Sequence, residues 1–250
     1  AQDENSEGNN EAIQFVINYD VSAPQPQLTW DLNSLTNKTQ IPINVSFNEP
    51  VKNLLSSDFK LANCKVDSFS GKDSLYYLQI SPIQSGILNV ELPASTLNDL
   101  AGNENIISNQ LSITFDGIIP IAGLVNDGDD EDIDFQMNYT TIKGSWNGFK
   151  DNETGIKEYK WAIGKEPGGT AVQAWQSVSL NKSASNDGLN IEDGKYFISV
   201  MAVDSAGNES NIVSSDGVNV DTKPPIAPEN LNATPGDMSI TLTWSSNTEI

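Results

Sequence analysis

The chain has 250 residues, enough for one or two domains, and carries 34 acidic against 13 basic side chains, for a net charge of -21. No two basic residues are adjacent, so the clustered positive charge that nucleic acid or an anionic membrane surface requires is missing. Histidine is absent and Cys64 is the only cysteine, which excludes an internal disulfide, a Ser-His or Cys-His nucleophile and an ordinary zinc site within these residues. No apolar run approaches the length of a membrane span, so we expect no direct membrane insertion in this segment.

One pattern recurs three times: an Asp, a turn, an alternating strand and then a second Asp ahead of a proline. The paired aspartates are Asp3 and Asp20, Asp99 and Asp116, and Asp204 and Asp221. Their spacing is 17 residues in each copy, and the closing aspartates recur after 96 and then 105 residues, which fits whole domains in a row. We therefore predict the C-terminal strand of a preceding domain at 1–20, complete sandwiches at 21–116 and 117–221, and the start of a further domain at 222–250. The chain would then be part of a longer protein.

Strand-like runs follow one another along the first half of the chain. Ile41, Ile43, Val45 and Phe47 alternate with polar residues, as in a half-buried strand, and Cys64 is expected to be a small buried hydrophobe on a strand. Gly, Asn, Ser and Pro separate the runs, and no stretch predicts an amphipathic helix. The predicted strands are 13–17, 28–30, 41–47, 59–61, 64–66, 75–80, 87–92 and 111–115. Short strands at this spacing predict an antiparallel β-sandwich.

The second half repeats this plan with different residues. Its predicted strands are 142–146, 156–163, 172–178, 196–203, 217–220 and 239–244. The run 196–203 is the most apolar and is expected to be a central strand. Core positions are expected for Trp146, Trp161 and Trp244, whereas Trp30 and Trp175 are expected to be exposed and able to stack on sugars.

Several motifs resemble known extracellular modules. The segments 45–51 and 97–103 resemble a bacterial immunoglobulin-like domain. A resemblance to a fibronectin type III domain is carried by Trp146 and the segments 159–161 and 196–207. A resemblance to the first strands of another such domain is carried by the segments 228–231 and 242–244. The linker 221–225 is similar to those between such modules in large bacterial surface proteins. The resemblance implies an all-β fold of tandem antiparallel β-sandwiches, immunoglobulin-like and then fibronectin type III-like, arranged as beads on a string.

The resemblance implies an adhesive or structural role. The absence of histidine, together with acidic residues whose spacing singles out no catalytic carboxylate pair, predicts no enzymatic activity. We expect a secreted, extracellular segment at a bacterial cell surface, acting as a semi-rigid stalk or spacer that presents other modules. Its partners would be other domains of the same chain and host or environmental glycans or proteins. Two alternatives stay open: a carbohydrate-binding or accessory module of a secreted polysaccharide-degrading enzyme, and a subunit of a surface filament or secretion assembly.

Calcium is the one cofactor that the sequence favours. In such a sandwich the loop after the sixth strand, the loop after the second strand and the incoming linker meet at one pole. Converging carboxylates repel one another, and a divalent cation with oxygen ligands would relieve this repulsion. The expected interdomain calcium ligands are Asp20, Glu49, Asp99 and Asn103 at one pole, and Asp116, Asp151, Glu153, Asp204 and Asn208 at the other. The alternative is that these Asp and Asn residues only form turns, with Gly102 and Gly207 supplying positive φ.

A further acidic run lies at 126–134. Counted from Asp127, an EF-hand would need Gly at the sixth position and Glu at the twelfth, where the chain has Asp132 and Asn138. The EF-hand pattern therefore fails. A solvated loop after the first strand is expected instead, with cation binding as the remaining alternative.

Overall fold

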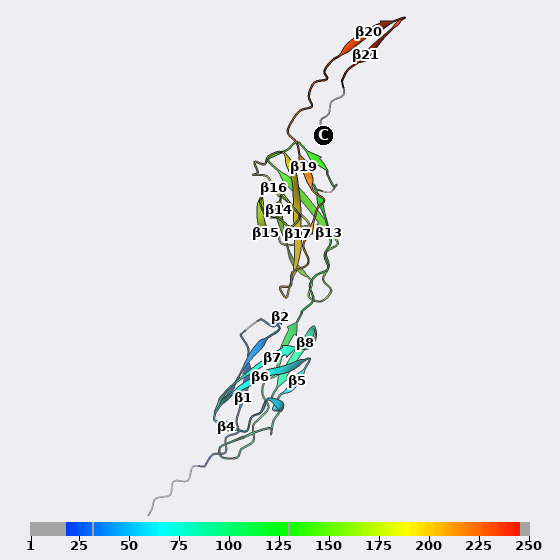
Figure 1. Ribbon diagram of the computed structural model, residues 1–250. Coiled ribbons are helices and arrows are strands. Elements are labelled where there is room, and N and C mark those ends of the chain that lie inside the picture. Colours follow the sequence, from blue (N-terminus) through cyan, green and yellow to red (C-terminus); the bar gives the residue numbers. More distant parts are fainter. Residues whose placement is uncertain (1–18, 32, 130, 246–250) are drawn as a thin grey trace, which may run out of the picture. The chain divides into compact units, whose positions relative to one another are not determined.

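The computed structural model describes residues 19–31, 33–129 and 131–245, and these divide into two compact units, one up to residue 118 and one from residue 119 (Figure 1). The fold is all-β, as predicted: within the described residues, the one helical element is a turn of 3-10 helix at Ser56–Asp58. None of the described helices is long and apolar enough to cross a membrane. The strand predicted at 13–17 lies outside the described residues, and the finer division into four segments stays a prediction.

The first unit is built from two sheets. One sheet has the order β1-β3-β7-β6 and the other has the order β2-β10-β8-β5, with β4 and β9 forming a separate two-stranded ribbon. This is the arrangement of an immunoglobulin sandwich, in which strands A, B, E and D form one sheet. Here β1, β3, β7 and β6 take the places of A, B, E and D in that order. The strands are β1 (Pro26–Thr29), β2 (Leu35–Thr36), β3 (Ile41–Phe47), β4 (Val51–Lys52), β5 (Lys60–Ala62), β6 (Cys64–Lys72), β7 (Leu75–Pro82), β8 (Gly86–Glu91), β9 (Asn98–Asp99) and β10 (Leu111–Phe115).

The core of the first unit follows the alternation of its strands. On β3 the four predicted inward residues from Ile41 to Phe47 are buried, and β3 pairs with β7 in the register Ile43↔Leu78. Cys64 is also buried, as predicted. Trp30 is a correction, because it is partly buried against this core instead of exposed. It directly follows β1, whose apolar residue Leu28 points inward.

The second unit is a sandwich of a three-stranded sheet, β11-β13-β16, and a six-stranded sheet in which β17 is central. On one side β17 pairs with β14, and on the other side it pairs with β18 and β19, which confirms the predicted central strand. The strands are β11 (Leu124–Asp127), β12 (Phe135–Gln136), β13 (Ile142–Asn147), β14 (Ile156–Gly164), β15 (Gln173–Ser177), β16 (Ser183–Asn186), β17 (Gly194–Asp204), β18 (Val213–Ser214) and β19 (Val218–Val220).

Aromatic side chains fill much of the second core. Trp146 and Trp161 are buried, as predicted, and the rings of Trp146 and Tyr159 meet edge to face at 6.0 Å. Tyr196, near the start of β17, is buried and donates its hydroxyl to the carbonyl of Glu192 at 2.9 Å. This is a tyrosine corner, a feature of immunoglobulin-type sandwiches.

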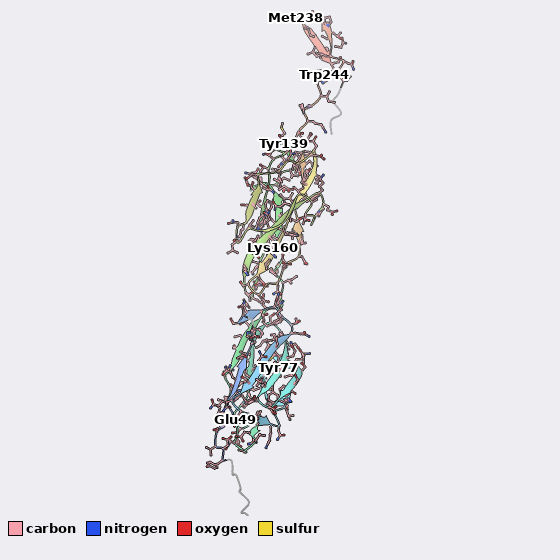
Figure 2. The ribbon with its side chains drawn as sticks, turned by 90° about the vertical axis from the view of Figure 1, so that its left-hand side faces the viewer. Glu49, Tyr77, Tyr139, Lys160, Met238 and Trp244 are labelled. Carbon is pink, nitrogen blue, oxygen red and sulfur yellow. The ribbon has the colours of Figure 1, made fainter. Side chains whose placement is uncertain are left out.

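Beyond residue 221 the chain forms a hairpin of β20 (Asn232–Gly236) and β21 (Ser239–Thr243). Figure 2 shows Met238 and Trp244 on this hairpin, and the side chain of Trp244 is 58% exposed. The prediction of a core position for Trp244 is therefore wrong here, because no second sheet covers the hairpin within the described residues. Trp175, which was expected to be exposed, is half-buried on β15.

Candidate functional site

The closing aspartates of the repeat all make the same local turn. In each case the carboxylate Oδ1 accepts the backbone N–H of the residue two positions further on, which is an Asx-turn. The three bonds run from Ser22 to Asp20 at 2.9 Å, from Ile118 to Asp116 at 3.0 Å and from Lys223 to Asp221 at 3.0 Å. The repeat in the sequence is therefore a repeat in hydrogen bonding.

The opening aspartates of the two described copies also share one network. Asp99 Oδ1 accepts the N–H of Gly102 at 2.6 Å and of Asn103 at 2.8 Å, and its Oδ2 accepts from Asn103 Nδ2 at 2.8 Å. Asp204 makes the corresponding three bonds to Gly207 and Asn208 at the same distances. The turn-forming role is thus present in both copies, and Gly102 and Gly207 have the positive φ that the turn needs.

The first unit brings its four predicted ligand residues together. Carboxylate oxygens of Asp20, Glu49 and Asp99 lie within 4.8 Å of one another, and Asn103 Nδ2 donates to the carbonyl of Asp20 at 3.1 Å. Burial raises the pKa of Glu49, and the charges of Asp20 and Asp99 raise it further. Burial also acts to raise the pKa of Asp99, but hydrogen bonds from the side chain and backbone of Asn103 and from neighbouring amides hold it below its usual value. The effect of Asp20 and Asp99 on the pKa of Glu49 is the one expected where acidic groups lie close together.

In the second unit the loops at 151–155 and 204–208 lie side by side, since the N–H of Ser205 donates to the carbonyl of Gly155 at 3.0 Å. One carboxylate oxygen of Asp151 lies within 4.8 Å of one of Asp204. Asp151 Oδ2 accepts the N–H groups of Thr154 and Gly155, whereas its Oδ1 is buried without a hydrogen-bond partner in the described part of the chain.

Glu153, another predicted member of that pole, lies in the loop 151–155. Glu153 is exposed and belongs to none of the acidic groups found among the described residues. Asp116 is at the end of the first unit, directly after β10, where its backbone N–H donates to the carbonyl of Thr36 at 3.0 Å. Asn208 turns its amide nitrogen toward Asp204.

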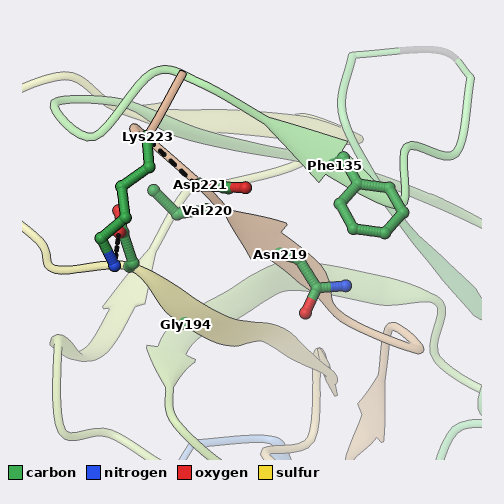
Figure 3. Close-up of a pocket in the computed structure, with 7 residues that line it drawn as sticks. Phe135, Gly194, Asn219, Val220, Asp221 and Lys223 are labelled. Carbon is green, nitrogen blue, oxygen red and sulfur yellow. Dashed lines mark hydrogen bonds and ion pairs between the residues drawn. The ribbon is translucent and has the colours of Figure 1, made fainter. Parts of the chain in front are cut away.

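A pocket of about 550 Å³ lies in the second unit, at the start of β17 and the end of β19. In the close-up, the Phe135 ring and Asn219 lie toward one end, while Lys223 lies at the other, with Val220 and Asp221 between them (Figure 3). Lys223 Nζ pairs with Asp193 Oδ2 at 2.9 Å. No sequence pattern indicated this pocket, because its residues come from three separate stretches of the chain.

Chemically, these sites offer carboxylate and amide oxygens, which suit hard cations, and one pocket with an exposed ring. Immunoglobulin-like and fibronectin type III-like folds are typically non-catalytic, and any function of such a sandwich resides in individual sites on it.

The chain is similar to several known proteins. Residues 20–115 match the family model of the bacterial Ig-like domain, and no curated protein sequence matches the chain. Similar solved structures include a crystal structure of a multidomain titin fragment, with 14% identity over 79% of this chain and 66% of that chain and a TM-score of 0.47. They also include fibronectin(III)-like modules of Clostridium thermocellum CbhA, with 15% identity over 77% of this chain and 93% of that chain and a TM-score of 0.39. A third is the FN1–FN3 domains of chicken CNTN1, with 12% identity over 91% of this chain and 76% of that chain and a TM-score of 0.30.

The chain spans just under two thirds of the length of the titin fragment. The family match covers the whole of the first sandwich, from the Asx-turn at Asp20 to the end of β10. Residues 20–115 therefore match the bacterial Ig-like domain family, and a second β-sandwich follows them in the chain.

Proposed function

We propose that this chain is a structural segment of a long extracellular bacterial surface protein, acting as a semi-rigid stalk or spacer that presents other modules. Two self-contained hydrophobic cores support this proposal, since each unit buries its own apolar strands. In this proposal the segment itself is not an enzyme. Its partners are neighbouring domains of the same chain, and adhesion to host or environmental glycans or proteins takes place through the modules it presents.

The observation that carries the proposal is the repeated connection. Each closing aspartate bonds to the N–H two residues on, and a proline follows at 24, 120 and 224. Proline fixes its own φ and restricts the residue before it. A short connection with one fixed hydrogen bond and one proline has few conformations, which is the property that a spacer needs and a flexible tether lacks.

Calcium at the poles is part of this proposal. It is supported in the first unit by the grouping of Asp20, Glu49 and Asp99, and in the second unit by the unpartnered oxygen of Asp151 beside Asp204. The test is thermal unfolding with calcium and with excess chelator. A melting temperature that chelator leaves unchanged rules out structural calcium at the poles.

Stiffness is tested by small-angle X-ray scattering of the chain and of the double variant Asp116→Ala/Pro120→Gly. The longest strand, β17, has 11 residues, so one unit is about 36 Å long at roughly 3.3 Å per residue. The proposal predicts a narrow distribution of dimensions for the natural chain and a broader one for the variant. Asp221→Ala is the matched control, because it removes the same kind of bond outside the connection at 116–120. A natural chain as variable as the double variant would refute a semi-rigid stalk, and self-association would favour a filament subunit.

A glycan-binding accessory module is the second candidate, and the pocket beside Phe135 favours it. The ring of Phe135 is 71% exposed, and aromatic faces next to polar groups suit sugars. A glycan panel with the natural chain and Phe135→Ala tests this candidate, with Tyr139→Ala as a control for an exposed ring outside the pocket. Binding lost only in Phe135→Ala would support the accessory role, and no binding by the natural chain would exclude it for the glycans tested.

A further inference from the structure

A third group of carboxylates lies within the second unit, away from the residues predicted at the poles. Asp127 is the last residue of β11, Asp132 lies in the loop between β11 and β12, and Asp216 lies in the turn between β18 and β19. Carboxylate oxygens of all three lie within 4.8 Å of one another. The group joins the two sheets of this sandwich, because β11 belongs to one sheet and β19 to the other.

The surrounding hydrogen bonds fix this geometry. The N–H of Asp127 donates to Asp132 Oδ1 at 3.0 Å, and the N–H of Ile133 donates back to the carbonyl of Asp127 at 3.2 Å, which closes the loop. On the other side, Asp127 Oδ2 accepts the N–H of Gly217 at 3.0 Å. Gly217 has a φ of +96°, and a Cβ there would meet the Lys195 side chain at 2.6 Å, so the turn can approach Asp127 only with glycine.

The other oxygen of Asp127 has no such partner. Asp127 is 0% exposed, yet its Oδ1 is buried without a hydrogen bond in the described residues. Buried carboxylate oxygens are almost always paired, because an unpaired one loses its hydration without compensation. A buried carboxylate oxygen without a hydrogen bond, beside two further carboxylates, is an arrangement that a bound cation would stabilise.

No side chain of the described residues supplies that partner. Lys143 lies on β13 beside this loop, but its Nζ pairs with Asp129 Oδ2 at 2.7 Å. The ion pairs found in the described part of the chain include none to Asp127, Asp132 or Asp216. Burial raises the pKa of Asp127 to about 6 against the hydrogen bonds of Ser215 and Gly217, and the charges of Asp132 and Asp216 raise it further.

We propose that Asp127, Asp132 and Asp216 form a Ca²⁺ site that ties the β11–β12 loop to the β18–β19 turn, with Asp127 Oδ1 as its buried ligand. Two oxygens that bind one Ca²⁺ at 2.3–2.6 Å lie at most about 5 Å apart, so the separations of these carboxylates fit a single ion. Asp132 and Asp216 are exposed, and water would complete the coordination from their side.

The donor set selects the class of ion. All three ligands are carboxylates, and the chain has no histidine, so softer metals that prefer nitrogen or sulfur are disfavoured. Mg²⁺ demands near-ideal octahedral geometry at shorter distances, whereas Ca²⁺ accepts irregular oxygen sets on loops. Affinity in the range of extracellular modules, a Kd of about 10⁻⁴ to 10⁻³ M, is expected.

The test is hydrogen–deuterium exchange of the whole chain, with chelator and with CaCl₂ up to about 10 mM, well above that range. Calcium should slow exchange in peptides covering 127–133 and 215–218. Peptides covering 99–103, 151–155 and 204–208 report the poles separately. Asp216→Asn should raise the calcium concentration that gives half of this protection by about tenfold or more, because one of three ligand charges is lost. Glu131→Gln is the matched control, since it removes an exposed charge of the same loop that is outside the group.

Asp132→Asn is the second variant, and its amide oxygen can still accept from the N–H of Asp127, so the loop is retained. Protection at both loops that is lost in Asp216→Asn and Asp132→Asn but kept in Glu131→Gln supports the site. Exchange at 127–133 and 215–218 that calcium leaves unchanged in the natural chain overturns it, whatever happens at the poles. Equal responses in Glu131→Gln and Asp216→Asn would also overturn it, because the effect would then be general charge screening.

Discussion

Replacing Tyr196 with Phe isolates one hydrogen bond of the second unit. The side chain is 2% exposed, and its hydroxyl donates to the Glu192 carbonyl at 2.9 Å. Phe keeps the ring and its packing, so the change removes the bond alone. Glu192 is itself exposed, and water can reach its carbonyl once the hydroxyl is gone. The cost is therefore close to the net value of one neutral hydrogen bond, about 1 kcal/mol.

That loss converts to a shift in melting temperature. The predicted second domain, 117–221, has an unfolding entropy of about 0.2 kcal/mol/K at the scale typical of proteins, so about 1 kcal/mol lowers its melting temperature by about 4–5 °C. Calorimetry of the whole chain measures this shift, and Trp fluorescence follows the second unit preferentially because Trp146, Trp161 and Trp175 all belong to it.

Tyr159→Phe is the matched control. Tyr159 is also buried on a strand of this sandwich, but its hydroxyl has no hydrogen bond among the described residues, so a change within about 0.5 kcal/mol is expected. The reasoning is refuted if Tyr196→Phe and Tyr159→Phe shift the transition equally. It is also refuted if Tyr196→Phe shifts the transition of the first unit.

Further predictions concern the first core, the acidic turns and the second connection. Ile43→Ala should destabilise the first unit by about 2–5 kcal/mol, because Ile43 is 1% exposed at the centre of its core; urea unfolding measures this, and a loss under about 1 kcal/mol would show that the core is loosely packed. Asp99→Ala should lower the melting temperature of the first unit more than Asp99→Asn does, since Asn still accepts from Gly102 and Asn103; equal effects would contradict the turn-forming role. The ion pair with Lys223 and the hydrogen bonds of Thr222 lower the pKa of Asp193 from 3.8 to about 2. Because this pKa is depressed, the stabilisation is present above pH 3.8 and is lost as the pH falls toward 2. The free energy of unfolding should therefore fall less between pH 5 and pH 2 in Asp193→Asn than in the natural chain. An equal fall in both would contradict a stabilising role of the Asp193 carboxylate.

The sequence predicted those strands whose alternation is set by burial on one face. Ile41–Phe47 and Leu111–Phe115 were predicted with their observed bounds, because apolar residues alternate there and turn residues flank them. The strand β6 was predicted only to residue 66, since its remaining residues are mostly polar and exposed. The strand β16 has no apolar pattern at all, and its pairing with β13 forms it instead.

For the acidic sites, the sequence indicated the poles and left cation binding at 126–134 as an alternative, but it did not indicate the group of Asp127, Asp132 and Asp216. The repeated Asp-to-Asn turns marked Asp99 and Asp204 because the pattern is local, within five residues. Asp127 was assigned with its neighbours to a solvated loop, although pairing with Gly144 makes it the buried end of a strand. Asp216 gave no signal because it lies far from Asp127 along the chain and approaches it only through the Gly217 turn.

The proposed stalk requires that the two sandwiches fold, and unfold under force, independently of each other. Pulling single molecules of the whole chain by its two ends tests it most directly. Unfolding about 100 residues releases roughly 300 Å of chain at about 3.5 Å per residue, less the length of the folded unit. The account predicts two separate unfolding events, each with an increment of this size. A single event releasing both units together, or extension without resistance, would contradict it.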